Sequence, residues 1–171
     1  GHDVTLIARG EQAAAIRQRG LVLESPDSIE TLHPEVADSP SSIHWTDSDV
    51  ILLTVKSQDS FAALHHLSLF APSTTPVICA QNGVANERTA LRWSSRVYGI
   101  CVMCPAAYLT PGVVQAWSAP SSGILDIGCF PRGVDDLCES VASSLRASRF
   151  HSEPQPDIMR WKYCKLLMSL G

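Results

Sequence analysis

Short runs of β-branched and apolar residues recur along this chain, and they constrain its fold more than any other feature. Four such runs occupy residues 4–8, 49–55, 76–80 and 97–103. Nearly continuous apolar runs of this length are typical of parallel strands that are covered on both faces. We therefore expect four buried strands, the first of them at residues 4–8.

Segments with helical character separate these runs. Residues 11–19, 60–70, 85–93 and 134–149 have the composition of helices. Gly20 is placed to end the first helix, and Asp59 or Ser60 can cap the second. Strands that alternate with helices of about ten residues predict right-handed crossovers and a mostly parallel sheet, so the expected fold class is α/β.

Two further regions are less regular. The polar stretch 25–42 contains three prolines, and we expect an irregular excursion there with at most an edge strand. Residues 113–118 and 124–127 are predicted as strands joined by a Pro-Ser-Ser-Gly turn. We expect these two strands to pair as an antiparallel edge.

The composition excludes several classes of function. The 171 residues are 45% hydrophobic and 18% charged, which is enough apolar surface for a folded core. The net charge of -4 argues against a nucleic-acid partner. Prolines and glycines interrupt the longest nearly uncharged stretch, residues 97–127, so no membrane span is predicted. Six cysteines without a secretory leader favour reduced thiols and a cytoplasmic location.

The best candidate for a domain boundary is the segment 153–157, which holds two prolines within three positions. We expect residues 1–152 to form one domain and residues 158–171 to begin a helical one. The chain starts at Gly1 and stops after an apolar helical stretch, so we expect it to be a piece of a longer protein.

In an open parallel sheet, ligands bind beyond the carboxyl ends of the strands, so the residues that follow the strands are the candidates for a site. Arg9, Lys56 and Asn82 each follow one of the apolar runs. An arginine after the second strand of a dinucleotide-binding fold accommodates the 2′-phosphate of NADP. From position alone, a solvated surface arginine is an equally good interpretation of Arg9.

Several short motifs, in order, carry a family resemblance. They are GHDVTLIARG at residues 1–10, VKS at 55–57, QNGV at 81–84 followed by NE at 86–87, and WKYCKLL at 161–167. With these motifs the chain resembles the ketopantoate reductase (2-dehydropantoate 2-reductase) family over nearly its whole length. The resemblance implies a Rossmann-like domain that binds NADPH, followed by an all-helical domain, and reduction of 2-dehydropantoate to pantoate in pantothenate biosynthesis. It also implies a possible homodimer.

The resemblance assigns roles to individual residues. Arg9 matches the position that contacts the 2′-phosphate of NADPH, and Lys56 matches a lysine on the cofactor side. Asn82 matches an asparagine near both the nicotinamide and the substrate. The glycine-rich turn that members of the family carry before the first of these motifs is absent from the sequence, and we expect the chain alone to be inactive.

Lys165 matches the catalytic lysine of the family. Hydride transfer to a ketone leaves negative charge on its oxygen, which a positioned ammonium can stabilise and protonate. Lys162 is the competing lysine, and we favour Lys165 because the Leu-Leu pattern follows it. Ser169 stands where the family has a second, substrate-binding asparagine, and this departure puts the usual substrate contact in doubt.

Other functions remain open. The protein could reduce a different 2-oxo acid, or it could be a nucleotide-binding module without catalysis, which the departure at Ser169 would favour. Cys101 and Cys104 have the spacing of a redox or metal pair, but residues three apart in a strand point to opposite faces. No metal site is expected.

Overall fold

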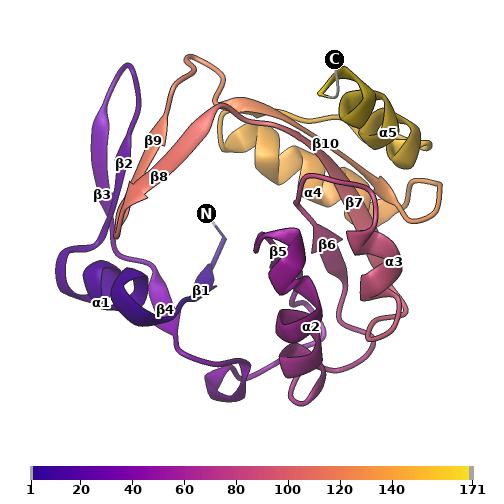
Figure 1. The fold of residues 1–171 in the computed structure, drawn as a ribbon, viewed down its shortest axis with the longest axis horizontal. Coiled ribbons are helices and arrows are strands. Elements are labelled where there is room, and N and C mark those ends of the chain that lie inside the picture. The colour runs from indigo at the N-terminus through magenta and orange to yellow at the C-terminus, as the bar shows by residue number, and fades with distance from the viewer. Residues whose placement is uncertain (1, 170–171) are drawn as a thin grey trace. The chain divides into compact units, whose positions relative to one another are not determined.

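The computed structural model describes residues 2–169, which belong to two compact units (Figure 1). The first unit contains the chain up to residue 44 together with residues 104–122. The second contains residues 45–103 and the chain from residue 123 onward. Each unit has its own sheets.

The first unit combines one helix with two small sheets. Strand β1 (Thr5–Ile7) pairs in parallel with β4 (Glu35–Ala37), and helix α1 (Gly10–Arg19) follows β1. The second sheet has the strand order β3-β2-β9-β8. Its strands are β2 (Leu21–Glu24), β3 (Ile29–Leu32), β8 (Ala106–Thr110) and β9 (Val113–Ala116). A short 3-10 helix, Pro40–Ser42, follows β4.

Several expectations for this unit are tested by the structure. Gly20 does end α1, and its N–H donates to Ile16 O at 2.8 Å. The strand at residues 4–8 was expected to be buried, which is wrong: Val4 and Ile7 are 57% and 41% exposed. Strand β1 has a paired neighbour along one edge only within the described chain, so much of its side-chain surface stays accessible.

Two other expectations concern irregular or edge structure. The stretch 25–42 forms β3 and β4, each at the edge of its sheet, so the expected edge strand is confirmed but the stretch is more regular than predicted. The predicted antiparallel edge between residues 113–118 and 124–127 does not form. Strand β9 pairs with β2 and β8, whereas the strand that begins at Gly123 pairs within the second unit. The turn between them therefore connects two sheets instead of two neighbours in one sheet.

The second unit contains a five-stranded sheet with the order β11-β10-β7-β6-β5. The strands are β5 (Ile51–Leu53), β6 (Val77–Cys79), β7 (Val97–Met103), β10 (Gly123–Cys129) and β11 (Phe150–His151). Strands β5, β6 and β7 are parallel, β10 runs antiparallel to β7, and β11 runs parallel to β10. The expected α/β class with a mostly parallel sheet is confirmed.

Helices cover both faces of this sheet. They are α2 (Ser60–Ser68), α3 (Asn86–Ala90), α4 (Asp136–Ala147) and α5 (Ile158–Met168), with a 3-10 helix at Ser57–Asp59 before α2. Helices α2, α3 and α4 are each shorter than the helical segments predicted at 60–70, 85–93 and 134–149. None of the helices within residues 2–169 is both long enough and apolar enough to span a bilayer.

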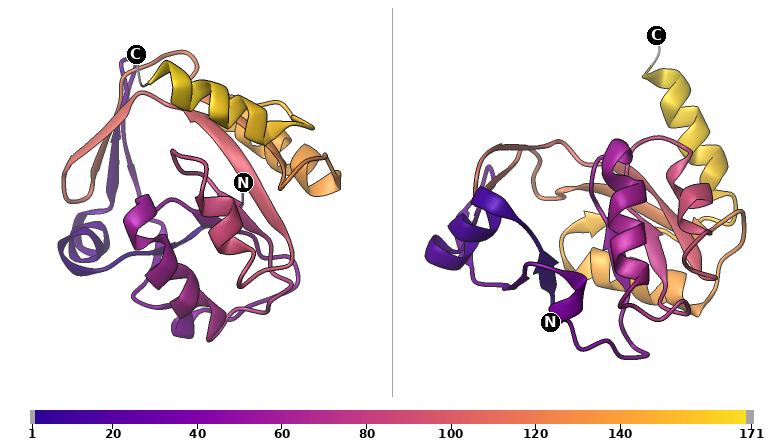
Figure 2. Two further views of the ribbon diagram at one scale, coloured as in Figure 1. Left: turned by 45° about the vertical axis from the view of Figure 1, so that its right-hand side comes forward. Right: turned by 60° about the horizontal axis from the view of Figure 1, so that its bottom comes forward.

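The alternation of side chains along β7 divides the core between the two faces. Tyr98 and Ile100 pack in the cluster that contains Cys138 and Ala142 of α4. Val97 packs on the opposite face, in the cluster that the residues of α2 and α3 complete. Helix α5 lies on that second face, where Ile158 and Met159 pack on Cys101 of β7. Figure 2 shows α4 and α5 on either side of β10.

The segment 153–157 lies against β10. Gln155 N donates to Ile127 O at 2.7 Å, and Ile127 N donates to Glu153 O at 3.1 Å. Gly128 makes this close approach possible, because a Cβ atom there would lie 2.1 Å from Gln155 O. These contacts hold the start of α5 on the sheet. Whether residues 158–171 also begin a separate helical domain stays a prediction.

We expect the substitution Gly128→Ala to destabilise the second unit, because the added methyl group would collide with the backbone of Gln155. Overpacking of this kind should lower the free energy of unfolding by about 3 kcal/mol. Urea denaturation measures the loss, and Ser140→Ala on the exposed side of α4 serves as the control. Equal stability of the two variants would contradict the close approach.

Candidate active site

The turn that follows β6 carries the polar side chains of the candidate site. It consists of Gln81, Asn82 and Gly83, and it lies at the carboxyl ends of the parallel strands β5 and β6. Gly83 has a φ of 87°, a conformation that glycine adopts without strain. The sheet topology thus places Asn82 where ligands bind in open parallel sheets.

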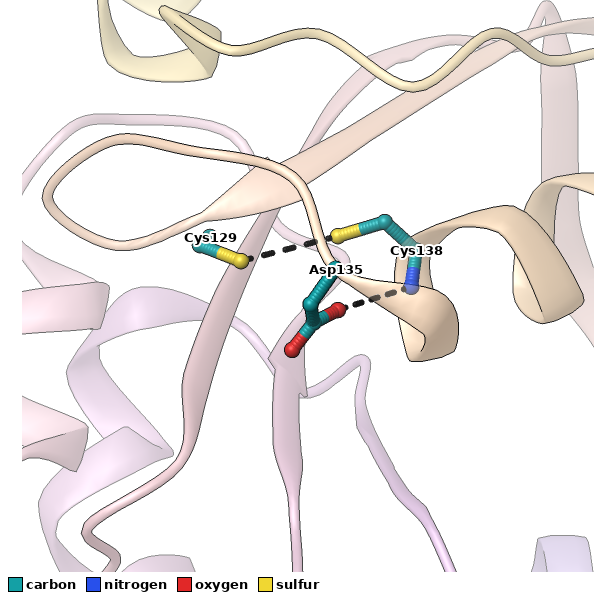
Figure 3. A group of neighbouring side chains, drawn as sticks. All are labelled: Cys129, Asp135 and Cys138. Carbon is teal, nitrogen blue, oxygen red and sulfur yellow. Dashed lines mark hydrogen bonds between the residues drawn. The ribbon is translucent and has the colours of Figure 1, made fainter.

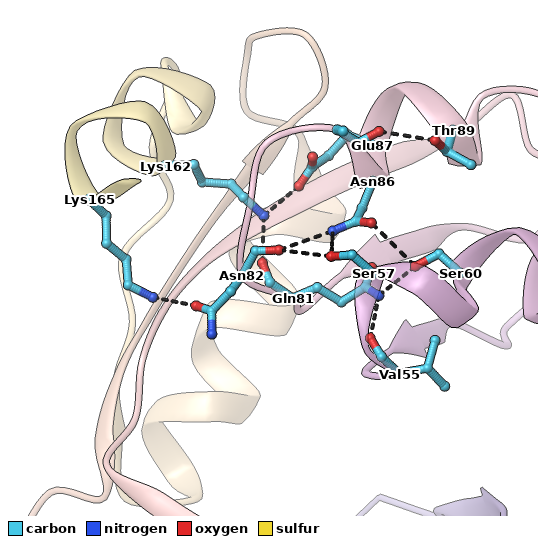
Figure 4. Close-up of polar contacts among 11 residues, drawn as sticks. Val55, Ser57, Ser60, Gln81, Asn82, Asn86, Glu87, Thr89, Lys162 and Lys165 are labelled. Atoms are coloured by element: carbon cyan, nitrogen blue, oxygen red, sulfur yellow. Dashed lines mark hydrogen bonds and ion pairs between the residues drawn. The ribbon is translucent and has the colours of Figure 1, made fainter. Parts of the chain in front are cut away.

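A chain of hydrogen bonds fixes this turn (Figure 4). Gln81 Nε2 donates to Ser60 Oγ at 2.8 Å, and Ser60 Oγ donates to Asn86 Oδ1 at 3.2 Å. Asn86 Nδ2 donates to Asn82 O at 3.1 Å and to Ser57 Oγ at 3.0 Å. Gln81, Ser60 and Asn86 are buried, and these bonds between them and their neighbours hold the turn in place. Among the described residues, the buried Gln81 Oε1 has no hydrogen-bond partner.

A buried ion pair attaches α5 to the same turn. Lys162 Nζ lies 2.5 Å from Glu87 Oε1, and the two side chains are 3% and 0% exposed. Lys162 Nζ also donates to Gln81 O at 3.0 Å. Gly99 of β7 leaves space for the pair, since a Cβ atom there would lie 3.2 Å from Glu87 Oε1. The ammonium therefore links α5, α3 and the turn after β6 at one point.

Lys165 lies one helical turn after Lys162 on α5 and reaches Asn82. Its Nζ donates to Asn82 Oδ1 at 2.5 Å (Figure 4) and also to the backbone oxygen of Val102. These groups border a cavity of about 410 Å³. The cavity is lined by Gln81, Asn82, Gly83, Ile100, Cys101, Val102, Lys162, Lys165, Leu166 and Ser169.

The hydrogen bond between Lys165 and Asn82 decides which groups the amide presents. Because Asn82 Oδ1 accepts from the ammonium, its Nδ2 is left as a donor. Two of the three ammonium hydrogens of Lys165 have protein acceptors, so one can be given to a ligand. A half-buried ammonium beside an amide donor suits an oxygen that is negatively charged or gains negative charge.

The neighbouring thiols do not offer a competing nucleophile. Burial raises the pKa of Cys79, behind the ion pair, to about 12. Burial also raises the pKa of Cys101, which lines the cavity, although Lys165 opposes this shift. Both thiols are therefore protonated at neutral pH, and protonated thiols are poor nucleophiles. The groups in the cavity that can act on a ligand are therefore the ammonium of Lys165 and the amide of Asn82.

The structure brings together some of the residues selected from the sequence. Asn82, Lys165 and Ser169 line one cavity. The hydroxyl of Ser169 donates to Lys165 O at 3.1 Å, so it is bonded to its own helix. Lys56 is exposed in the loop after β5 and, among the described residues, is not part of the cavity lining. Arg9 is exposed at the start of α1 in the other unit.

Sequence reasoning missed the role of Glu87 and considered Lys162 only as a rival of Lys165. Both residues lie in motifs that carry the family resemblance, but charged residues on helices are usually solvated, so the sequence does not mark them as a buried pair. The signal that could have found them is Gly99, a glycine inside an otherwise apolar strand, which often marks a close approach of other groups.

We expect removal of either partner to destabilise the protein, because the other charge would stay buried without a counter-charge. Glu87→Leu and Lys162→Met should each lower the free energy of unfolding by about 3 kcal/mol. The double variant should recover most of that loss, since apolar residues of similar size can replace a buried pair. Chemical denaturation of the wild type, the two single variants and the double variant gives the coupling energy between the two side chains. Glu139→Leu, on the exposed surface of α4, is the control. Additive losses would contradict the pairing.

Known proteins are similar to this chain in sequence and in fold. The family model "Ketopantoate reductase PanE/ApbA" matches residues 1–132. The 2-dehydropantoate 2-reductase of Pyrococcus horikoshii is 31% identical over 169 residues, which cover 99% of this chain and 54% of that protein. The chain therefore spans about half the length of this curated relative.

Two solved structures extend the comparison. The PanE/ApbA family ketopantoate reductase from Ralstonia eutropha JMP134 has a TM-score of 0.84 and 25% identity, over 99% of this chain and 54% of that one. A D-mandelate dehydrogenase solved with NADH and anilino(oxo)acetate has a TM-score of 0.79 and 19% identity, over 96% of this chain and 53% of that one. The expected Rossmann-like fold is thus confirmed. Because the family model matches more than half of its residues, the chain belongs to the ketopantoate reductase family.

Proposed function

We propose that this chain is part of an NADPH-dependent reductase that converts 2-dehydropantoate to pantoate in pantothenate biosynthesis, in the cytoplasm. The observation that carries the proposal is the contact of Lys165 Nζ with Asn82 Oδ1 at the edge of the cavity. Family membership and the curated relative from Pyrococcus horikoshii support the substrate.

The proposed chemistry adds one hydride and one proton across a ketone. The reduced nicotinamide, when bound, supplies the hydride to the carbonyl carbon. Lys165 donates a hydrogen bond to the carbonyl oxygen, stabilises the negative charge that grows there, and transfers a proton to it. Asn82 Nδ2 orients the ligand as a neutral donor. The product is the 2-hydroxy acid.

The surroundings of the two lysines favour Lys165 over Lys162 as the catalytic residue. Lys162 is buried, and its ammonium is bonded to Glu87 and to Gln81 O, so it holds structural contacts. Lys165 is only half-buried, and its bonds to Asn82 and Val102 O leave one hydrogen for a ligand. We therefore propose Lys165 as catalytic and Lys162 as structural.

For the cofactor we propose NADPH, held in part by Arg9 and Lys56. Arg9 follows β1 and precedes α1, where an arginine accommodates a 2′-phosphate. The D-mandelate dehydrogenase of similar fold was solved with NADH, so the fold alone does not select the dinucleotide with a 2′-phosphate. The guanidinium of Arg9 is the feature of this chain that favours the phosphorylated form.

Reduction of another 2-oxo acid is the second candidate. The D-mandelate dehydrogenase was solved with anilino(oxo)acetate, so a protein of this fold accepts a different oxo acid. Ser169 supports this alternative, because its hydroxyl is bonded to Lys165 O where the family carries a longer asparagine. Binding of NADPH without turnover of any oxo acid would instead support a nucleotide-binding module.

The catalytic assignment is tested with Lys165→Ala in the longest natural form of the protein that contains this chain. Loss of the proton donor should lower kcat for 2-dehydropantoate by about 10²–10⁴-fold, with unchanged folding. Arg160→Ala, on an exposed position of the same helix, is the matched control. The assay follows NADPH absorbance with a panel of 2-oxo acids. Full turnover by Lys165→Ala would disprove the assignment.

The cofactor assignment is tested with Arg9→Ala. We expect Kd for NADPH to rise at least tenfold, since a charge-assisted contact with phosphate is lost, while Kd for NADH stays within about twofold. Fluorescence titration of both dinucleotides measures the ratio, and Arg19→Ala at the other end of α1 is the control. An equal effect of Arg9→Ala on both cofactors would contradict a role in phosphate recognition.

A further inference from the structure

Three side chains with metal-binding donor atoms gather where β10 leads into α4. Cys129 is the last residue of β10, Asp135 precedes the first turn of α4, and Cys138 lies within that turn. Figure 3 shows the two thiols facing each other with the carboxylate of Asp135 beside them. The three donor atoms all lie within 4.8 Å of one another.

The spacing of the sulfur atoms fits a tetrahedral ion. Cys129 Sγ and Cys138 Sγ are 3.8 Å apart. Two thiolates bound to Zn²⁺ at about 2.3 Å in a tetrahedron are separated by about 3.8 Å. The sulfur atoms therefore need no rearrangement to bind such an ion, whereas a disulfide would require them to approach to about 2.05 Å.

The carboxylate is held in place by a backbone N–H of α4 and by a tyrosine hydroxyl. Asp135 Oδ1 accepts from Cys138 N at 3.0 Å, and Oδ2 accepts from Tyr98 Oη at 2.7 Å. Each carboxylate oxygen has a second lone pair that stays available for an ion. A ligand whose orientation is fixed by outer hydrogen bonds is typical of metal sites.

The net charge of the cluster and its access to solvent also suit a divalent cation. Two thiolates, one carboxylate and a divalent cation carry a net charge of about -1, which the positive end of α4 offsets in part. Arg96 contributes further positive charge, since it donates to Tyr98 Oη at 3.4 Å. Cys138 is buried, Cys129 is half-buried and Asp135 is exposed, so solvent can reach a fourth coordination position.

We propose that Cys129, Asp135 and Cys138 form a binding site for a thiophilic divalent cation, with Zn²⁺ as the best match and water as the fourth ligand. The site lies on the face of the sheet that α4 covers, whereas α5 and Lys165 belong to the opposite face. Its role is structural, because the ion would fasten α4 to the end of β10. The proposal is independent of the reductase function.

A divalent cation binds cysteine as the thiolate, so binding at this site would release the two thiol protons to solvent.

The test is a titration of the reduced chain with Zn²⁺ against a chromophoric chelator, and with Co²⁺ to detect thiolate-to-cobalt charge-transfer absorption. We expect one ion per chain at neutral pH. Cys129→Ser and Asp135→Asn should each weaken binding at least tenfold. Cys164→Ser removes an exposed cysteine elsewhere and should change nothing. Circular dichroism confirms that each variant is folded.

Three results would contradict the proposed metal site. One is a folded, reduced chain that binds neither ion. Another is unchanged affinity in Cys129→Ser, which would place the ion elsewhere. A third is the absence of metal binding together with a Cys129–Cys138 disulfide after peroxide treatment, seen as a mass loss of two hydrogens, which would assign a redox pair instead.

Discussion

The geometry of the cavity depends on the buried ion pair between Lys162 and Glu87. Lys162 Nζ bonds to Glu87 Oε1 and to Gln81 O at the same time, so a single ammonium joins α5 to the turn after β6. Gly99 makes room for the pair beneath the helix. Because Lys165 lies one helical turn further along α5, fixing Lys162 also fixes where Lys165 meets Asn82.

This arrangement separates two tasks that the sequence places three residues apart. One lysine is buried and bonded to a carboxylate, and it holds the helix. The other is half-buried and bonded to neutral oxygens, and it faces the cavity. A buried ion pair contributes little net stability compared with an apolar contact. Here the pair instead fixes the position and orientation of α5 on the sheet.

The sequence predicts part of this picture well. Continuous apolar runs predict the parallel strands, and the rule that ligands bind past their carboxyl ends selects Asn82. Lys165 needs the family resemblance in addition, because a lysine on a helix is usually solvated. Burial of β1 and the pairing of β9 were predicted incorrectly, since both depend on which strands become neighbours. Glu87 was missed because only the folded chain brings it to Lys162, 75 residues away.

In the proposed reaction, the ammonium of Lys165 meets the oxygen of the ketone being reduced. A crystal structure of the longest natural form of the protein, with oxidised cofactor and a 2-oxo acid bound, tests it most directly. We expect the ketone oxygen to lie within about 3 Å of Lys165 Nζ, and Asn82 Nδ2 to donate a hydrogen bond to the ligand. A ligand oxygen that lies beside Lys162, or outside this cavity, would contradict it.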